Sequence, residues 1–208
     1  MDGKRLYMEH TLVPQQHIGS QMDVRAETIL SDIGKAAFFY QLAKTRLQDV
    51  NNWDKLCRTS STIFQITSFK GVDAENLALS NLIKIDIPGP GTSAGEGYDW
   101  VQIEKIESSD ENHLDEWMGF TVRPCASPLH PQMGIAHFFS DLATSTFIVG
   151  RTGNTVWAEM HGRNEVPNSD TSTVVDGLRN AMVGWTAKIG LSFPQWKLLV
   201  DGLVRKED

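Results

Sequence analysis

A β-hairpin is the feature of this sequence that most restricts its fold. Residues 144–151 and 155–161 flank Gly153 and Asn154, two residues that tolerate the positive φ angles of a tight turn. A turn at these two residues fixes the strand register, because Thr152 then faces Thr155 and every later pair follows. The sequence therefore predicts antiparallel sheet in the second half of the chain.

The predicted register gives the hairpin two different faces. One face is apolar and should join the core; it consists of Phe147, Val149, Ala158 and Met160. The opposite face combines an aromatic ring, a carboxylate and an imidazole, contributed by Trp157, Glu159 and His161. We expect this second face to be either the wall of a site or a solvated surface.

The polar run that continues the second strand is the best candidate for a functional cluster. Glu159 and His161 can act as a general acid and base, and Arg163 can hold a carboxylate or phosphate through two donors. The predicted ligand-binding residues are Trp157, Glu159, His161, Arg163, Asn164 and Glu165. Because exposed polar residues are common, a solvated strand end is the competing interpretation.

The first half of the chain predicts an arm followed by helix. Residues 1–22 have no period and are interpreted as an irregular N-terminal arm, whereas residues 23–208 are interpreted as a single α+β domain. Apolar residues then recur at three- and four-residue steps, which predicts one long helix from Asp23 to Val50, with Asp23 as its cap. A short helical turn is expected at residues 53–57.

The same helix suggests a partner hypothesis. Phe38 and Phe39 widen its apolar surface beyond a single seam, so the helix suits either core packing or a homodimer. A homodimer through the helix from Asp23 to Val50 is therefore kept as an alternative.

Alternating residues predict the remaining strands. They lie at residues 61–69, 83–87, 98–107 and 117–123. Ile106 is out of phase with Val101 and Ile103, which a β-bulge near Glu104 and Lys105 corrects. Residues 135–139 fit either a helical turn or a strand edge.

The C-terminal part predicts two helices. Ser172 can cap the first, which Gly190 ends, and Ser192 with Gln195 has the form of a capping box for the second. The predicted fold class is thus α+β: an N-terminal long helix, a central, mostly antiparallel curved sheet of about five or six strands, and a C-terminal helix pair packed on the sheet.

Composition restricts the partners. The net charge of −7 and the lack of a dense basic stripe argue against nucleic acid. Cys57 and Cys125 are too few for a disulfide framework, and no leader or membrane segment is evident, so we expect a cytoplasmic protein that does not enter membranes. No signature predicts a metal or another cofactor.

Two isolated chemical motifs were weighed and set aside. The glycine-rich residues 89–97 resemble a phosphate-binding loop only in composition, since a strand pattern and not a helix follows them. Cys125 has His130 and His137 downstream, but a single cysteine is more often simply buried.

Three functional hypotheses follow. The first is a non-enzymatic module that binds a small molecule or partner in a pocket between sheet and helices, an arrangement that fits helix-grip or NTF2-like architectures by analogy alone. The second is a hydrolase or isomerase that uses Glu159 and His161, and the third is a homo-oligomeric adaptor or structural subunit. Whether the chain is an enzyme, and what its ligand is, stays open at the level of sequence.

Overall fold

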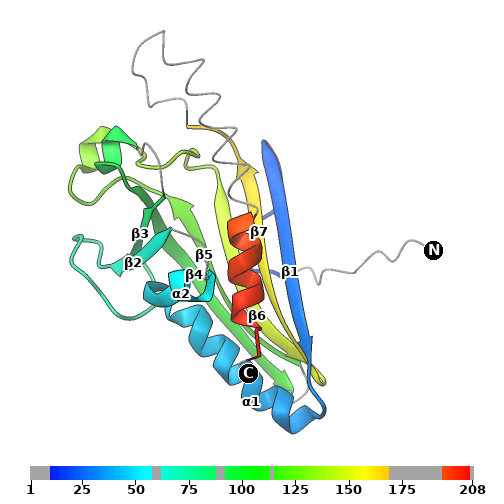
Figure 1. Cartoon of the computed structure of the whole chain (residues 1–208). Helices are drawn as coiled ribbons and strands as arrows, with labels where there is room; N and C mark the ends of the chain where they lie inside the picture. Colours follow the sequence, from blue (N-terminus) through cyan, green and yellow to red (C-terminus); the bar gives the residue numbers. More distant parts are fainter. Residues whose placement is uncertain (1–9, 58–61, 88–91, 113–114, 169–193, 207–208) are drawn as a thin grey trace.

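The protein, seen in a computed structural model, is built on one seven-stranded antiparallel sheet with helices on one face (Figure 1). The structure describes residues 10–57, 62–87, 92–112, 115–168 and 194–206. The strands are β1 (Ser20–Ile29), β2 (Ile63–Thr67), β3 (Leu82–Asp86), β4 (Asp99–Asn112), β5 (Asp115–Pro124), β6 (Thr144–Thr152) and β7 (Thr155–Glu165). Their order across the sheet is β1-β7-β6-β5-β4-β3-β2. The α+β class is as predicted, but the sheet has one or two strands more than expected.

The additional strand is β1, and it corrects the predicted helix from Asp23 to Val50. The first part of that region is strand, and α1 covers only Ile33–Gln48. Ala26 and Ile29 happen to continue the three- and four-residue spacing of α1, yet the side chain of Ile29 is largely exposed. The match between the spacing of Ala26 and Ile29 and that of the buried residues of α1 is therefore a coincidence.

A two-residue period in the same segment indicates a strand and outweighs the helical spacing of Ala26 and Ile29. Charged residues occupy every second position, Asp23, Arg25 and Glu27, while Val24 between them is buried in the core. Consequently Asp23 is not a helix cap. Asp32 caps α1 instead, because its carboxylate accepts the backbone N–H of Lys35 at 2.8 Å.

The hairpin matches its prediction pair by pair. Thr152 lies opposite Thr155, Val149 opposite Ala158, and Gly150 opposite Trp157. Gly153 has a φ of 59°, as the two-residue turn requires. The bulge predicted at Glu104 is also present, since the pairing of β4 with β5 shifts between Ile103 and Lys105.

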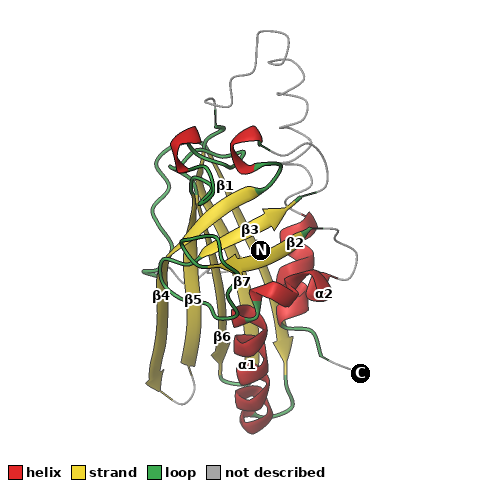
Figure 2. Ribbon diagram, turned by 90° about the vertical axis from the view of Figure 1, so that its left-hand side faces the viewer, coloured by secondary structure: helices red, strands yellow, loops and turns green. Residues whose placement is uncertain are grey.

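Helices cover one face of the sheet, called the inner face below (Figure 2). They are α1, α2 (Trp53–Cys57) and a C-terminal helix at residues 194–203. The apolar side of the C-terminal helix is buried as predicted, through Leu199, Val200 and Leu203. Together with the inward residues of the strands these side chains form the main hydrophobic core.

The opposite face, called the outer face, is covered by irregular segments. Residues 10–19 run across its β1-β7-β6-β5 side, and a second apolar cluster forms around Trp100 at the β3-β4 side. Residues 135–139 form neither helix nor strand and pair only through isolated bridges of Ile135 with Ala126 and of Phe139 with Pro167.

The predicted helix at residues 172–190 lies outside the described residues, as does the proposed cap Ser192. Of the predicted C-terminal pair, the structure therefore describes one helix. In the part of the chain that is described, no helix has both the length and the apolar character needed to cross a membrane.

Candidate functional site

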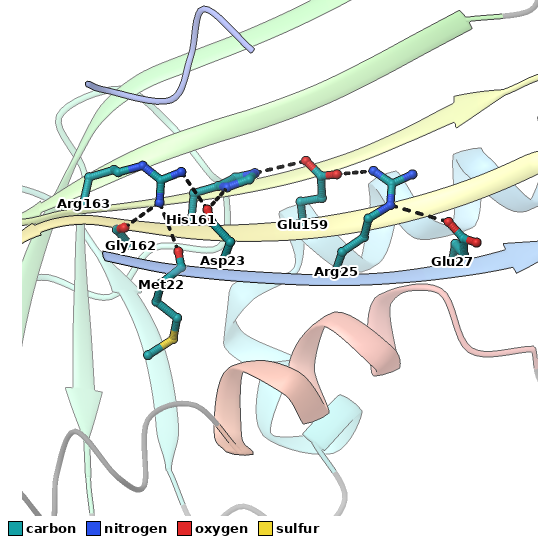
Figure 3. Close-up of polar contacts among 8 residues, drawn as sticks. All are labelled: Met22, Asp23, Arg25, Glu27, Glu159, His161, Gly162 and Arg163. Carbon is teal, nitrogen blue, oxygen red and sulfur yellow. Dashed lines mark hydrogen bonds and ion pairs between the residues drawn. The ribbon is translucent and has the colours of Figure 1, made fainter. Parts of the chain in front are cut away.

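A row of alternating charges runs along the outer face where β1 meets β7 (Figure 3). His161 Nδ1 lies 2.6 Å from Asp23 Oδ1, and His161 Nε2 lies 3.0 Å from Glu159 Oε2. Arg25 forms an ion pair with Glu159, and Arg163 donates to Asp23 Oδ1 at 2.6 Å. The two strands are thus joined by side chains as well as by their backbones.

The imidazole of His161 lies between two carboxylates. A neutral imidazole carries one N–H, but here each ring nitrogen faces a carboxylate, so both hydrogen bonds form only when the ring is an imidazolium. The row then alternates cation and anion along its whole length: Arg163, Asp23, His161, Glu159, Arg25 and Glu27. Such a row neutralises itself internally.

Glu159 shows the electrostatic result. Burial alone raises the pKa of this carboxyl, but the hydrogen bond from His161 and the charges of His161 and Arg25 outweigh burial and lower the pKa overall. The side chain of Glu159 is 0% exposed and His161 is 2% exposed. A buried carboxylate with two cationic partners is stable as an anion and is shielded from any substrate.

The N-terminal arm covers this row. Leu12 inserts between Trp157 and Ile148 and over Gly119, where an added Cβ would lie 2.7 Å from its Cδ2 atom. The ring of His10 packs edge-on against Trp117, with 5.0 Å between ring centroids. Burial lowers the pKa of His10, which favours its neutral form beside the row.

Asn164 holds the next part of the arm. Its side-chain oxygen accepts the backbone N–H groups of His17 and Ile18 at 2.7 and 3.2 Å, and its amide donates to the carbonyl of Gln15 at 3.0 Å. The predicted ligand-binding residue Asn164 is therefore occupied by the chain's own backbone.

Glu165 lies on the other face from Trp157, Glu159 and His161. Asn164 has a φ of 53°, and the pairing of β1 with β7 shifts between Ser20 and Met22. This bulge reverses the alternation of β7, so Glu165 points to the inner face together with its partner Ser20. A Cβ added to the inward-facing Gly162 would lie only 2.2 Å from Glu165 Oε1.

The surroundings of Glu165 differ sharply from those of Glu159. Among the described residues, the hydroxyl of Ser20 is the group that donates to its carboxylate, at 3.0 Å. The nearby Arg163 is engaged by Asp23 and by the carbonyls of Met22 and Gly162. Burial raises the pKa of Glu165 overall; the hydrogen bond from Ser20 and the charge of Arg163 oppose this rise, and the charge of Asp23 adds a smaller contribution to it.

Between Glu165 and the turn end of the hairpin, where Arg151 forms an ion pair with Glu116, the inner face is largely apolar and aromatic. Phe147 on β6 lies 4.9 Å from Trp53 of α2 and 5.3 Å from Trp196 of the C-terminal helix, between ring centroids. Phe64 on β2 extends this layer at 5.4 Å from Trp53. Rings from separate elements thus meet between the sheet and the helices.

Of the two other motifs, residues 89–91 of the glycine-rich loop lie outside the described residues, and Cys125 is half-buried. Burial raises the pKa of Cys125 to about 12, the opposite of what an activated nucleophile needs. His130 pairs with Glu96, and His137 Nδ1 accepts the N–H of Phe139. Within the described residues, no group of three or more histidine, cysteine or acidic side chains is placed to hold a metal.

The six residues proposed from the sequence are thus divided between two faces. Trp157, Glu159, His161 and Arg163 lie in or beside the outer row, Asn164 fastens the arm, and of the six only Glu165 lies on the inner face. The outer row also contains three residues that were not predicted as site residues: Asp23, Arg25 and Glu27. Their alternation with apolar residues in β1 was the available signal.

Comparison with known proteins gives a general likeness of fold. No family model and no curated protein matches the sequence. A hypothetical protein from Helicobacter pylori is 12% identical, with 88% of this chain and 86% of that chain covered and a TM-score of 0.46. A protein from Mycobacterium smegmatis is 13% identical over 90% of this chain and 92% of its own, with a TM-score of 0.41.

The major latex-like protein 151 of Panax ginseng is 9% identical, with 84% of this chain and 98% of that chain covered and a TM-score of 0.34. Identities and scores at this level carry no functional conclusion. Function is therefore inferred from the side chains of this chain alone.

Proposed function

We propose that this chain is a non-enzymatic binding module for a small, largely apolar molecule, held between the inner face of the sheet and the C-terminal helix. The observation that carries the proposal is Glu165, a carboxyl that is 6% exposed, accepts only the Ser20 hydroxyl among the described residues, and borders a largely apolar part of the inner face. Aromatic rings alone would be ordinary core. A core does not need a lone carboxyl, whereas a ligand site combines apolar walls with a few polar groups.

The outer row also favours a binding module over an enzyme, because its charged groups are already engaged with one another. Glu159 and His161 are in contact, as an acid–base pair requires, but each is buried and engaged by a charged partner. Their geometry suits a fastening between β1 and β7 better than it suits a reaction with a substrate. The acid–base hypothesis is therefore the weaker one.

Thermal unfolding with a panel of neutral apolar compounds, including 1-naphthylmethanol, tests the proposal. Binding should raise the melting temperature, since a ligand specific for the folded state stabilises it by mass action. The shift should weaken in Trp196→Phe on the inner face and persist in Trp117→Phe on the outer face; both tryptophans are half-buried. A panel that produces no shift in the full chain would overturn the proposal.

A second, partner-binding hypothesis concerns α1. Phe39 is buried in the core, but Phe38 is 79% exposed on the helix surface. Together with Ile33, which is 50% exposed at the start of α1, this ring is the apolar surface that the helix offers to a second copy of the chain. Sedimentation should then show dimers that Phe38→Ser dissociates, and a monomer at high concentration would eliminate the homodimer. The cytoplasmic location expected from the sequence remains part of the proposal.

A further inference from the structure

The carboxyl of Glu165 resembles one half of a buried ion pair. It lies against Gly162 on the inner face, with only the Ser20 hydroxyl donating to it among the described residues. A neutral hydroxyl satisfies one of the acceptor positions of a carboxylate, which has room for about four hydrogen bonds. The position therefore leaves most of the carboxylate's hydrogen-bonding capacity unused.

The nearest protein cation does not fill this role. The guanidinium of Arg163 is directed at Asp23 Oδ1 and at two backbone carbonyls, on the side of the row. The charge of Arg163 still lowers the pKa of Glu165, by more than the charge of Asp23 raises it, but among the described residues no cation forms an ion pair with this carboxylate. The buried carboxylate itself and the chain's net charge of −7 favour an incoming cation over an anion.

An organic ammonium group suits this position better than a hydroxyl group does. Burying either an ammonium or a carboxylate alone is costly, but each compensates the other when they form a hydrogen-bonded pair. The apolar body of such a ligand would contact the aromatic layer around Phe147 and Trp196.

We propose that the ligand of this module is an apolar amine, whose ammonium group pairs with the carboxylate of Glu165 while its body lies on the aromatic inner face. This inference rests on the proposed function above. It specifies in addition that the ligand is positively charged and that Glu165 is the residue that selects it.

Two isosteric probes test the proposal in the full chain. 1-Naphthylmethylamine and 1-naphthylmethanol have nearly the same shape, and the first stays an ammonium ion from about pH 4 to pH 7. Titration calorimetry at neutral pH should show the amine binding about ten- to a hundredfold more tightly than the alcohol, the range of a charge-assisted hydrogen bond. Amine affinity should also fall as the solution is acidified and Glu165 takes up a proton, whereas alcohol affinity should not.

Three variants identify the carboxylate responsible. Glu165→Gln keeps the shape and the acceptor for Ser20 but removes the charge, so the preference for the amine should disappear. Gly162→Ala keeps the charge but adds a Cβ that displaces the carboxylate end, so the preference should shrink. Glu75→Gln, at an exposed loop position, removes the same charge elsewhere and should leave the preference intact.

The outcomes separate the two proposals. Equal affinity for amine and alcohol in the unaltered chain would overturn the amine inference while leaving an apolar binding module in place. Failure of both probes, together with a flat compound panel, would overturn both. An amine preference that survives in Glu165→Gln would overturn the assignment of this residue.

Discussion

Glu159 and Glu165 lie six residues apart on the same strand, both buried, yet they have opposite electrostatic surroundings. Glu159 lies in a row of alternating charges and has a lowered pKa, whereas Glu165 has a hydroxyl neighbour and a raised pKa. The first is fully compensated by the protein and fastens β1 to β7. The second leaves a charge for something else to compensate, and this distinguishes a structural carboxylate from a candidate binding group.

Removing each carboxylate should give the largest contrast. Glu159→Leu leaves Arg25 and His161 without their shared anion and should lower the free energy of unfolding by about 3–5 kcal/mol. Glu165→Leu removes a carboxyl that forms no ion pair among the described residues, so it should change that free energy by less than about 1 kcal/mol, or stabilise the protein. Urea unfolding of both variants checks this, and equal losses would remove the distinction.

Two glycines give a second contrast between the faces. A Cβ at Gly150 on the outer face would lie 2.2 Å from the Trp157 ring, which is held by Leu12 and Ile148 and cannot yield easily. Gly150→Ala should therefore destabilise the protein by about 1–3 kcal/mol. At Gly162 on the inner face the obstructing atom is the end of the flexible Glu165 side chain, so Gly162→Ala should cost less than about 1 kcal/mol.

Urea unfolding of the two alanine variants measures this difference. The urea concentrations at the unfolding midpoints can be compared directly if the dependence of the unfolding free energy on urea concentration is the same in both variants. A larger loss at Gly162 would mean that the Glu165 carboxylate is held rigidly. That result would weaken the binding role proposed for it.

The two faces also differ in how far the sequence could predict them. The hairpin register was predictable because Gly153 and Asn154 mark the turn, and a single turn fixes every pair behind it. The bulge at Glu104 was predictable because Ile106 broke a regular alternation. Both are local signals.

The arrangement of the site required information that is not local. β1 was mistaken for helix because Ala26 and Ile29 shared the phase of α1, so Asp23 and Arg25 could not be placed beside Glu159 and His161. The bulge at Asn164 depends on the positive φ of a non-glycine residue and on its contacts with residues 15–18, and no sequence pattern announces it. Strict alternation along β7 would place Glu165 on the outer face with Glu159 and His161, and only the bulge turns its side chain to the inner face.

A third experiment separates the arm from the inner face. Asn164→Gly keeps the positive φ available but removes the side-chain bonds to His17, Ile18 and Gln15, so it should cost about 1–2 kcal/mol and speed proteolysis of the arm. Asn164→Asp keeps the acceptor for the two N–H groups and should show a smaller effect. Binding of 1-naphthylmethanol should be unchanged in both, and a loss of binding would show that the arm supports the inner face.

The smallest and most specific contrast is in the pH dependence of stability. Glu159 has a pKa below the ordinary 4.5, so its stabilising contribution is complete above that value and is lost as pH falls through the folded-state pKa. Glu165 has a pKa above the ordinary 4.5, so the unfolded chain releases this proton first and stability declines as pH rises toward the folded-state pKa. The two carboxyls therefore act on stability with opposite slopes.

Unfolding free energies of the unaltered chain, Glu159→Gln and Glu165→Gln, measured from about pH 3 to pH 8, isolate each slope by subtraction. The advantage of the unaltered chain over Glu159→Gln should grow with pH, and its advantage over Glu165→Gln should shrink. Saturating 1-naphthylmethylamine should flatten the second difference, because an ammonium partner lowers the pKa of the carboxyl that it binds. Slopes of the same sign would mean that Glu165 is already paired within the protein, and the carboxylate proposed to bind the amine would then be unavailable to it.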